Sequence, residues 1–247
     1  MSGSERVLTG IPGLEEMLNG GFPRGRVILL VGGPGAGKTI FSSQFIFSGI
    51  EKQNENGVYV SLDESQHHYL KEMSAFGWNL EKFEKEKKWI FIDASPIGDK
   101  DPKSKTERLT IGRKDFSLSN LLERILSSFK EIGAKRIAID PITSLVFQYP
   151  DIIQRREAIL KLIETLAKTG ATSILTIELK SSGLERNVQL EEYLAHGVII
   201  LQTIQVGNSS TRVIQIEKMR EVFIDPQIRP YRITESGIEV YPKESVF

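Results

Sequence analysis

The stretch VGGPGAGKT, residues 31–39, constrains this chain more than any other part of its sequence. It follows the apolar run at 27–30 and satisfies the pattern G-x-x-x-x-G-K-[ST]. Glycines let such a loop wrap closely and point its N–H groups inward, because no Cβ blocks the approach. The β-branched run before the loop predicts a strand, and the phenylalanine-rich stretch after it predicts a buried helix. We therefore predict a strand–loop–helix unit that binds nucleotide phosphates; the alternative is a glycine-rich turn without a ligand.

Individual positions of this loop have predictable chemical roles. Lys38 is expected to place its charge on the β- and γ-phosphates, and the Thr39 hydroxyl is expected to ligate Mg²⁺. The helix that begins here adds the positive end of its dipole. The predicted nucleotide-binding residues are Gly32, Gly33, Pro34, Gly35, Ala36, Gly37, Lys38, Thr39 and Ile40.

Composition excludes several other kinds of chemistry. The 247 residues include no cysteine, which removes disulfides, cysteine-ligated zinc and thiol catalysis. Lysine plus arginine equals aspartate plus glutamate at 32 each, so no global charge attracts nucleic acid or an acidic membrane. No stretch reaches the roughly 18 apolar residues that span a bilayer, and the polar start is not a signal peptide. We expect a cytoplasmic chain without a membrane partner, folded as one domain over 1–247.

Strand-like and helix-like segments alternate along the chain and predict an α/β fold. Apolar stripes at helical spacing predict helices around Leu118–Phe129 and Ile159–Leu166. Because the early strands read as continuous apolar runs, we expect a mostly parallel sheet with helices on both faces, followed by a C-terminal antiparallel extension. Polar segments at 97–115 and 180–189 lack periodicity and predict loops. Strands are predicted at Arg26–Val31, Gly57–Leu62, Trp89–Ala94, Arg136–Asp140, Thr172–Glu178, Val198–Ile204 and Thr211–Lys218, with a closing hairpin at Tyr231–Thr234 and Ile238–Tyr241.

Hydrolysis needs a second carboxylate near Mg²⁺ and a base for the attacking water. Asp140 ends an apolar strand, RIAID, and is the candidate metal carboxylate; capping of a turn or helix is the alternative. Glu64 is the first candidate for the base and Asp63 the second, because both follow the strand YVSL. The alternative is that Asp63 and Ser65 cap a helix beginning at Gln66.

A pair of cations lies near the end of a later strand. Lys218 and Arg220, in IEKMRE, are two positions apart and so share one face of a strand. They either reach the nucleotide of a neighbouring subunit or form an exposed, solvated edge, and the spacing alone favours the solvated edge.

These motifs together resemble a known family. The segments TGIPGLEEMLNGGFPRGRVILLVGGPGAGKT, AFGWNL, FIDASP, RIAIDPIT, EKMRE and IRPYRITESGIEVYP occur in order and cover nearly the whole chain. They are similar to those of a single-domain KaiC-like ATPase of the RecA superfamily.

The resemblance implies a RecA-like P-loop NTPase core that binds ATP and Mg²⁺ between adjacent subunits of a ring, usually a hexamer. It assigns Lys38 and Thr39 to the Walker A motif and Asp140 to Walker B. It also assigns Asp63 and Glu64 to a paired acidic motif, with Glu64 as the catalytic base. It makes Lys218, Met219 and Arg220 a strand that reaches the neighbour's nucleotide, and sets Thr176 and Glu178 near the γ-phosphate. The chain departs from the clock protein KaiC in having one domain rather than two, so a kinase or timing role is not expected.

The sequence is consistent with three functions. The first is a slow, Mg²⁺-dependent regulatory ATPase that acts as a homo-oligomer on an unknown protein partner. The second is a recombinase-like ATPase stimulated by single-stranded DNA, whose support is the basic content of the loops at 97–115 and 180–189. Against it, these charges alternate with acids, and few aromatic side chains stand nearby for base stacking. The third is a module that binds ATP only in order to assemble.

Overall fold

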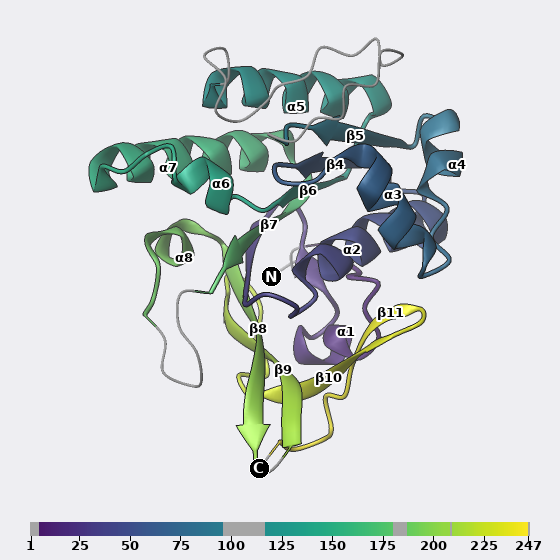
Figure 1. Cartoon of the computed structure of the whole chain (residues 1–247), viewed down its shortest axis with the longest axis vertical. Coiled ribbons are helices and arrows are strands. Elements are labelled where there is room, and N and C mark those ends of the chain that lie inside the picture. The colour runs from purple at the N-terminus through teal and green to yellow at the C-terminus, as the bar shows by residue number, and fades with distance from the viewer. Residues whose placement is uncertain (1–4, 96–116, 180–186, 208, 247) are drawn as a thin grey trace.

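A computed structural model describes residues 5–95, 117–179, 187–207 and 209–246 of the chain. Helices and strands alternate through the first two thirds, and strands dominate the remainder (Figure 1). The strands are β1 Arg6–Val7, β2 Phe22–Pro23, β3 Val27–Gly32, β4 Gly57–Ser61, β5 Trp89–Asp93, β6 Arg136–Asp140, β7 Thr172–Glu178, β8 Gly197–Val206, β9 Ser209–Met219, β10 Arg229–Thr234 and β11 Gly237–Val240. The helices are α1 Leu14–Met17, α2 Lys38–Gln53, α3 Gln66–Ser74, α4 Leu80–Lys85, α5 Leu118–Ile132, α6 Thr143–Val146, α7 Ile152–Thr169 and α8 Leu190–Leu194.

One mixed sheet organises the fold. Its nine described strands run in the order β11-β10-β9-β8-β3-β7-β6-β4-β5. The six strands from β8 to β5 are parallel, and β9, β10 and β11 continue the sheet as antiparallel hairpins. Strand β3, which carries the glycine-rich loop, lies in the middle with β7 on one side and β8 on the other. The predicted fold class, a mostly parallel sheet with an antiparallel extension, is confirmed.

Side chains of β3 show why helices must cover both faces. All six residues of this strand are buried, and successive side chains point to opposite faces of a sheet. Ile28 and Leu30 join a core cluster with Phe41 and Phe45 of α2, while Leu29 joins a second cluster built with α5 and α7. Figure 1 accordingly shows α2 on one side of the sheet and α5 and α7 on the other.

Several predicted boundaries were wrong by a few residues. Leu62 and Ala94 lie beyond β4 and β5. Their N–H groups still donate to the backbone carbonyls of Asp140 and Ser61 in the neighbouring strands, at 2.8 and 2.9 Å. β8 and β9 extend further than predicted, because they pair with each other past the edge of the parallel strands. The short elements α1, α4, α6, α8, β1 and β2 were not predicted. The polar loop at 97–115 and most of the loop at 180–189 lie outside the described residues.

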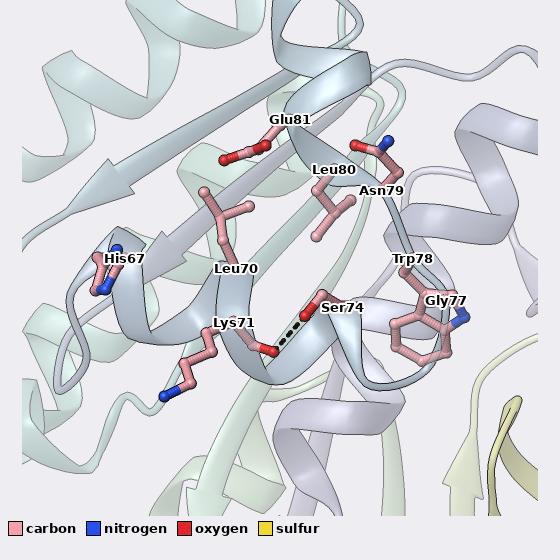
Figure 2. A pocket seen from close by; sticks show the side chains of 9 residues that line it. All are labelled: His67, Leu70, Lys71, Ser74, Gly77, Trp78, Asn79, Leu80 and Glu81. Carbon is pink, nitrogen blue, oxygen red and sulfur yellow. Dashed lines mark hydrogen bonds between the residues drawn. The ribbon is translucent and has the colours of Figure 1, made fainter.

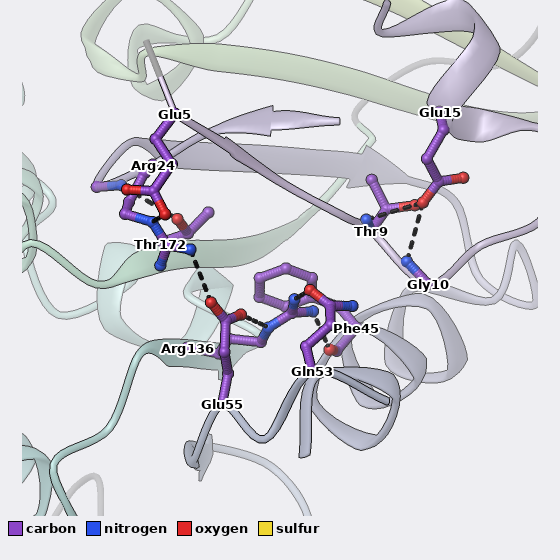
Figure 3. A network of polar contacts seen from close by, with 11 residues as sticks. Glu5, Thr9, Gly10, Glu15, Arg24, Phe45, Gln53, Glu55, Arg136 and Thr172 are labelled. Carbon is purple, nitrogen blue, oxygen red and sulfur yellow. Dashed lines mark hydrogen bonds and ion pairs between the residues drawn. The ribbon is translucent and has the colours of Figure 1, made fainter. Parts of the chain in front are cut away.

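A buried arginine locks helix α2 against strand β6 (Figure 3). The fully buried Arg136 guanidinium donates to Glu55 at 2.8 Å and to the Phe45 carbonyl at 2.7 Å. It also donates to Gln53 at 2.5 Å and lies 4.4 Å from the centre of the Phe45 ring. Arg24 pairs with the same Glu55 at 2.8 Å. Because α2 begins at the glycine-rich loop and β6 ends at Asp140, this contact fixes the relative position of two parts of the predicted site.

The carboxyl ends of β3, β4, β6 and β7 meet at one edge of the sheet. Register pairs Gly32 with Glu178, and Ser61 with Asp140. Loops at this edge are where ligands bind in open α/β sheets. In the part of the chain that the structure describes, no helix combines the length and apolar character needed to cross a bilayer.

Candidate functional site

The loop after β3 has the shape of a phosphate cradle. Gly35 and Gly37 have φ of 71° and 88°, a region that side-chain-bearing residues rarely adopt, so glycine is needed at both positions. Helix α2 begins immediately afterwards, at Lys38, with Gly37 as its N-cap and no side-chain cap hydrogen bond. Its first N–H groups therefore remain available to an anion. The Lys38 ammonium donates to the carbonyls of Gly32 and Gly33 at 2.8 and 3.2 Å, which places it directly over the loop.

Asp140 is the centre of a hydrogen-bonded group of hydroxyls. Thr39 donates to its Oδ2 at 2.7 Å, and the buried Tyr59 hydroxyl donates to the same oxygen at 2.8 Å. Thr176 donates to Oδ1. No cluster of three or more histidine, cysteine or acidic side chains suited to a metal occurs in the described residues. The contact between the Thr39 hydroxyl and the Asp140 carboxylate nevertheless fits Mg²⁺, which prefers oxygen ligands and keeps several waters.

The two candidate bases have different surroundings. Asp63 accepts a hydrogen bond from Ser144, and partial desolvation raises the pKa of its carboxyl. The half-buried Glu64 has its N–H bonded to Ser61 Oγ at 2.9 Å, while its carboxyl makes no hydrogen bond within the described ranges. Burial, together with the charges of Glu72 and Asp140, raises the pKa of Glu64 to about 7. Ser65 is the N-cap of α3 without a side-chain cap bond, so the capping alternative for Asp63 and Ser65 is not seen.

A cavity of about 190 Å³ joins these groups beside the loop. Burial lowers the pKa of the Lys38 ammonium, and the charges of Asp140 and Glu178 oppose this shift. Glu178 is exposed at the end of β7 and lines the cavity together with Asp140. The lining residues are Lys38, Thr39, Tyr59, Ser61, Asp63, Glu64, Asp140, Pro141 and Glu178. The structure thus brings together the predicted loop lysine, metal residues and acidic pair.

Lys218, Met219 and Arg220 do not join this group. Register places Ile214 of β9 level with Gly32, at the carboxyl end of β3. Lys218 instead pairs with Val198, near the amino end of β8. Three residues of β8, from Val198 to Leu201, separate the two levels, about 10 Å at 3.3 Å per residue, because a bulge in β9 accounts for the fourth residue between Ile214 and Lys218. The Lys218 ammonium donates to the carbonyls of Glu192 and Tyr193 at 3.0 and 3.4 Å. These residues therefore lie away from the chain's own glycine-rich loop.

Positive charge gathers around these cations at the amino edge of the parallel strands. Arg220 is exposed and makes no ion pair with any described residue. Burial and then the charge of Arg220 lower the pKa of Lys218. The neighbouring His196 accepts from the Val27 N–H at 3.0 Å, and burial followed by the charges of Arg26, Arg220 and Lys218 lowers its pKa. β10 pairs with β9 at Val213 and Ile214, so Lys218 and Arg220 lie beyond that pairing, and both roles predicted for them, a contact to a neighbour's nucleotide and a solvated edge, stay predictions.

Met219 and Ile40, both predicted to contact nucleotide, contribute to packing. Met219 is buried, and its sulfur lies against Gly197 of β8. Ile40 is partly buried and packs against the core cluster under α2.

Sequence reasoning missed several polar partners in the site. Tyr59 bonds to Asp140, Ser144 to Asp63, and Ser61 to the Glu64 backbone. A signal existed for Tyr59 and Ser61, because strand alternation places both on the face that Asp140 approaches. Ser144 carried no such signal, since it comes from the short helix α6.

A larger pocket of about 490 Å³ lies between α3 and α4, and Figure 2 shows its lining side chains. It shares no lining residue with the cavity beside the glycine-rich loop. Trp78 at its rim is buried and stacks on Phe47 and Phe76, as expected for a core residue, and His67 is exposed. The phosphate chemistry therefore belongs to the smaller cavity.

A central strand, a glycine-rich loop and an acidic edge of this kind define a P-loop protein with a RecA-type fold. A family model described as "ATPase: KaiC" matches residues 7–245. The chain therefore belongs to the KaiC family of ATPases.

Individual relatives agree with this assignment. A UPF0273 protein of Thermotoga maritima is 35% identical over 242 residues, which cover 97% of each chain. A circadian clock oscillator protein KaiC from a Nostoc species is 34% identical, and the match covers 98% of this chain but 45% of that protein. The crystal structure of a KaiC-like protein from Pyrococcus horikoshii matches with a TM-score of 0.82 and 38% identity, covering 97% of this chain and 100% of that one.

Proposed function

We propose that this chain is a single-domain, Mg²⁺-dependent ATPase that works slowly as a homo-oligomeric ring, a hexamer, with ATP between neighbouring protomers. Its nucleotide state would regulate a protein partner. One observation carries the proposal of shared sites. Lys218 lies about 10 Å along the sheet from the level of Gly32, and Arg220, whose N–H donates to the His196 carbonyl, lies further away, so a second copy is needed to bring them to a nucleotide.

Within one protomer, the described residues divide the work of binding and hydrolysis. The N–H groups of Gly33, Gly35 and residues 37–39 would hold the phosphates, and the Lys38 ammonium would leave the Gly32 and Gly33 carbonyls for phosphate oxygens. Thr39 and Asp140 would hold Mg²⁺, which when bound supplies charge neutralisation at the phosphates. Thr176 and Tyr59 would keep the Asp140 carboxylate oriented.

Glu64 would accept the proton of the attacking water, since its carboxyl faces the cavity free of hydrogen bonds to described residues. With a pKa of about 7, roughly half of this carboxyl is deprotonated at neutral pH and available to act as a base. Asp63 is held by Ser144 and is the less suitable base. Glu178 would lie near the γ-phosphate.

The neighbouring protomer would supply the missing positive charge. Arg220 would stabilise the charge that develops on the transferred phosphoryl group, as an arginine supplied from a second chain does in other P-loop enzymes. The adjacent Lys218 adds to the local positive charge that attracts a polyphosphate, whereas Arg26 forms an ion pair with Glu221. Met219, between the two cations, would contact the same nucleotide through its backbone.

Mixing two variants tests the shared site directly. Lys38→Ala should abolish nucleotide binding, and Arg220→Ala should keep Mg-ATP binding but lose turnover. Each interface combines the loop of one chain with the arginine of the next. When equal amounts of the two variants are co-assembled at random, about one interface in four has both an intact loop and an intact arginine. Turnover should therefore return to about a quarter of the wild-type rate. Assembled mixtures that stay inactive would refute the proposal of a shared site, and so would an Arg220→Ala protein with the wild-type rate.

The DNA-stimulated alternative is tested in the same assay. Steady-state ATP turnover is measured with Mg²⁺ at low salt, with and without single-stranded DNA. A slow rate that is indifferent to DNA is expected here. Strong stimulation would replace the regulatory role with a recombinase-like one.

A further inference from the structure

The C-terminal hairpin of β10 and β11 packs against the P-loop, although no step of the proposed hydrolysis uses the hairpin. Figure 1 shows this yellow hairpin beside α1 at the lower end of the molecule. Gln44 of α2 donates to the Ile238 carbonyl at 3.0 Å and accepts from the Ile238 N–H at 2.6 Å. This pair of bonds ties β11 to the first half of the helix that begins at Lys38.

Tyr231 of β10 reaches the P-loop itself. Its hydroxyl donates to the Ala36 carbonyl at 2.6 Å, and the residue is only 2% exposed. Burial raises the pKa of this phenol further above its usual value, so the hydroxyl remains a donor throughout the physiological range. The bond joins positions 195 residues apart in the sequence.

The bond constrains the peptide unit that links Ala36 to Gly37. That unit is trans, since the one cis bond of the described residues joins Asp140 and Pro141. In a planar trans peptide the C=O and N–H point in opposite directions. Anchoring the Ala36 carbonyl on the hairpin side therefore turns the Gly37 N–H away from Tyr231. Within the described ranges this N–H makes no hydrogen bond of its own.

Packing restricts the same unit from below. A Cβ built on Gly37 would meet Ile233 Cδ1 at 3.0 Å and Ile238 Cδ1 at 3.4 Å, so the hairpin fills the space under this residue. A peptide held at its oxygen and packed beneath cannot rotate freely. Hydrogen bonding at the carbonyl also polarises the amide and makes its N–H a stronger donor.

We propose that Tyr231 is a positioning residue for nucleotide binding, which holds the Ala36 carbonyl so that the Gly37 N–H is presented to the phosphates. This inference rests on the proposed function and goes beyond it by giving the C-terminal hairpin a role in affinity. The contact concerns the loop and not the γ-phosphate site, so diphosphate and triphosphate should be affected alike. Such uniform binding alters KM without altering kcat.

The test compares Tyr231→Phe with Tyr241→Phe. Both remove one phenolic hydroxyl from the C-terminal region, but the Tyr241 hydroxyl bonds to Glu239 at 3.1 Å, away from the loop. Dissociation constants for Mg-ADP and for Mg-ATP are measured by calorimetry at 25 °C, with thermal unfolding and steady-state turnover in parallel. Loss of one oriented donor should raise the dissociation constants of both nucleotides by roughly five- to tenfold. KM should rise by a similar factor, kcat should stay within twofold, and Tyr241→Phe should match the wild type.

The outcomes separate the inference from the proposed function. A Tyr231→Phe protein that melts earlier yet binds Mg-ADP as tightly as the wild type would show that the hydroxyl serves stability alone, and would overturn the inference. A loss of kcat at unchanged affinity would overturn it as well. A wild-type chain that binds no nucleotide would refute the proposed function, and the inference with it.

Discussion

The raised pKa of Glu64 makes a sharp prediction about pH. A general base acts only when deprotonated, and a carboxyl with a pKa of about 7 gains its proton as the pH falls through neutrality. The value of kcat/KM for ATP should therefore decrease toward low pH, with an acid limb centred near 7. An ordinary glutamate, with a pKa of about 4.3, would leave the rate flat over the same range.

The size of the effect follows from simple titration. At pH 6 about 9% of Glu64 would be deprotonated and at pH 8 about 91%, so kcat/KM should rise roughly tenfold between them. Burial is the largest cause of the shift, and the charge of Glu72 is the second. Removing that charge in Glu72→Gln should move the acid limb to lower pH while keeping the base. Glu72 is exposed on α3, so the variant should fold normally.

The assay is initial ATP turnover at saturating Mg²⁺ over pH 5.5–9, for the wild type, Glu72→Gln and Glu64→Gln. Phosphate groups also titrate, near pH 6, but a protein substitution does not move their pKa in the free substrate. A shift of the limb in Glu72→Gln therefore assigns it to the protein. Glu64→Gln should bind ATP and lose turnover at every pH. The reasoning fails if the limb stays in place in Glu72→Gln, or if Glu64→Gln keeps the wild-type rate.

Three further substitutions examine the loop, the metal residue and the buried arginine. Lys38→Ala should abolish Mg-ATP binding in calorimetry without lowering the melting temperature, because the hydrogen bonds of its ammonium to described residues go to loop carbonyls alone. Asp140→Asn should weaken Mg²⁺-dependent turnover about 10- to 100-fold in a magnesium titration, and an unchanged magnesium response would exclude it from the metal site. Arg136→Met should cost about 3 kcal/mol in urea unfolding, since it removes the buried partner of Glu55. Arg24→Met, which loses a partly exposed contact to the same Glu55, should cost about 1 kcal/mol or less, and equal losses would contradict this account.

Local patterns were enough to predict the parallel half of the fold and, in the cavity, the loop lysine, Thr39, Asp140 and the acidic pair. Strand β3 is a continuous apolar run, and the glycines that follow it have the spacing of a phosphate-binding loop, a pattern that is rare in other kinds of loop. Asp140 and Glu64 could be predicted because they follow strands whose carboxyl ends meet at one edge. Each of these inferences uses only residues close in sequence and one rule of sheet geometry.

Contacts between distant segments could not be predicted in the same way. Tyr231 bonds to Ala36 across 195 residues, and no spacing within IRPYRIT points to the loop. The same holds for Ser144 and Asp63, which are 81 residues apart. Such pairs depend on the register between strands and on how a hairpin packs, which are set by the whole core. The bounds of β8 and β9 were wrong for a related reason, because their pairing with each other prolongs them.

On the proposed function, each chain carries two half-sites at different levels of one sheet, a P-loop and a cation cluster. Contacts between copies are then head to tail, since a loop meets the cations of the next chain. An open row of such copies always leaves one loop without cations, whereas a closed ring leaves none. A dimer should accordingly show at most about half the turnover per chain of a closed ring. Turnover per chain should rise with protein concentration as light scattering reports assembly, and a monomer with the full rate would show that the cations of β9 act elsewhere.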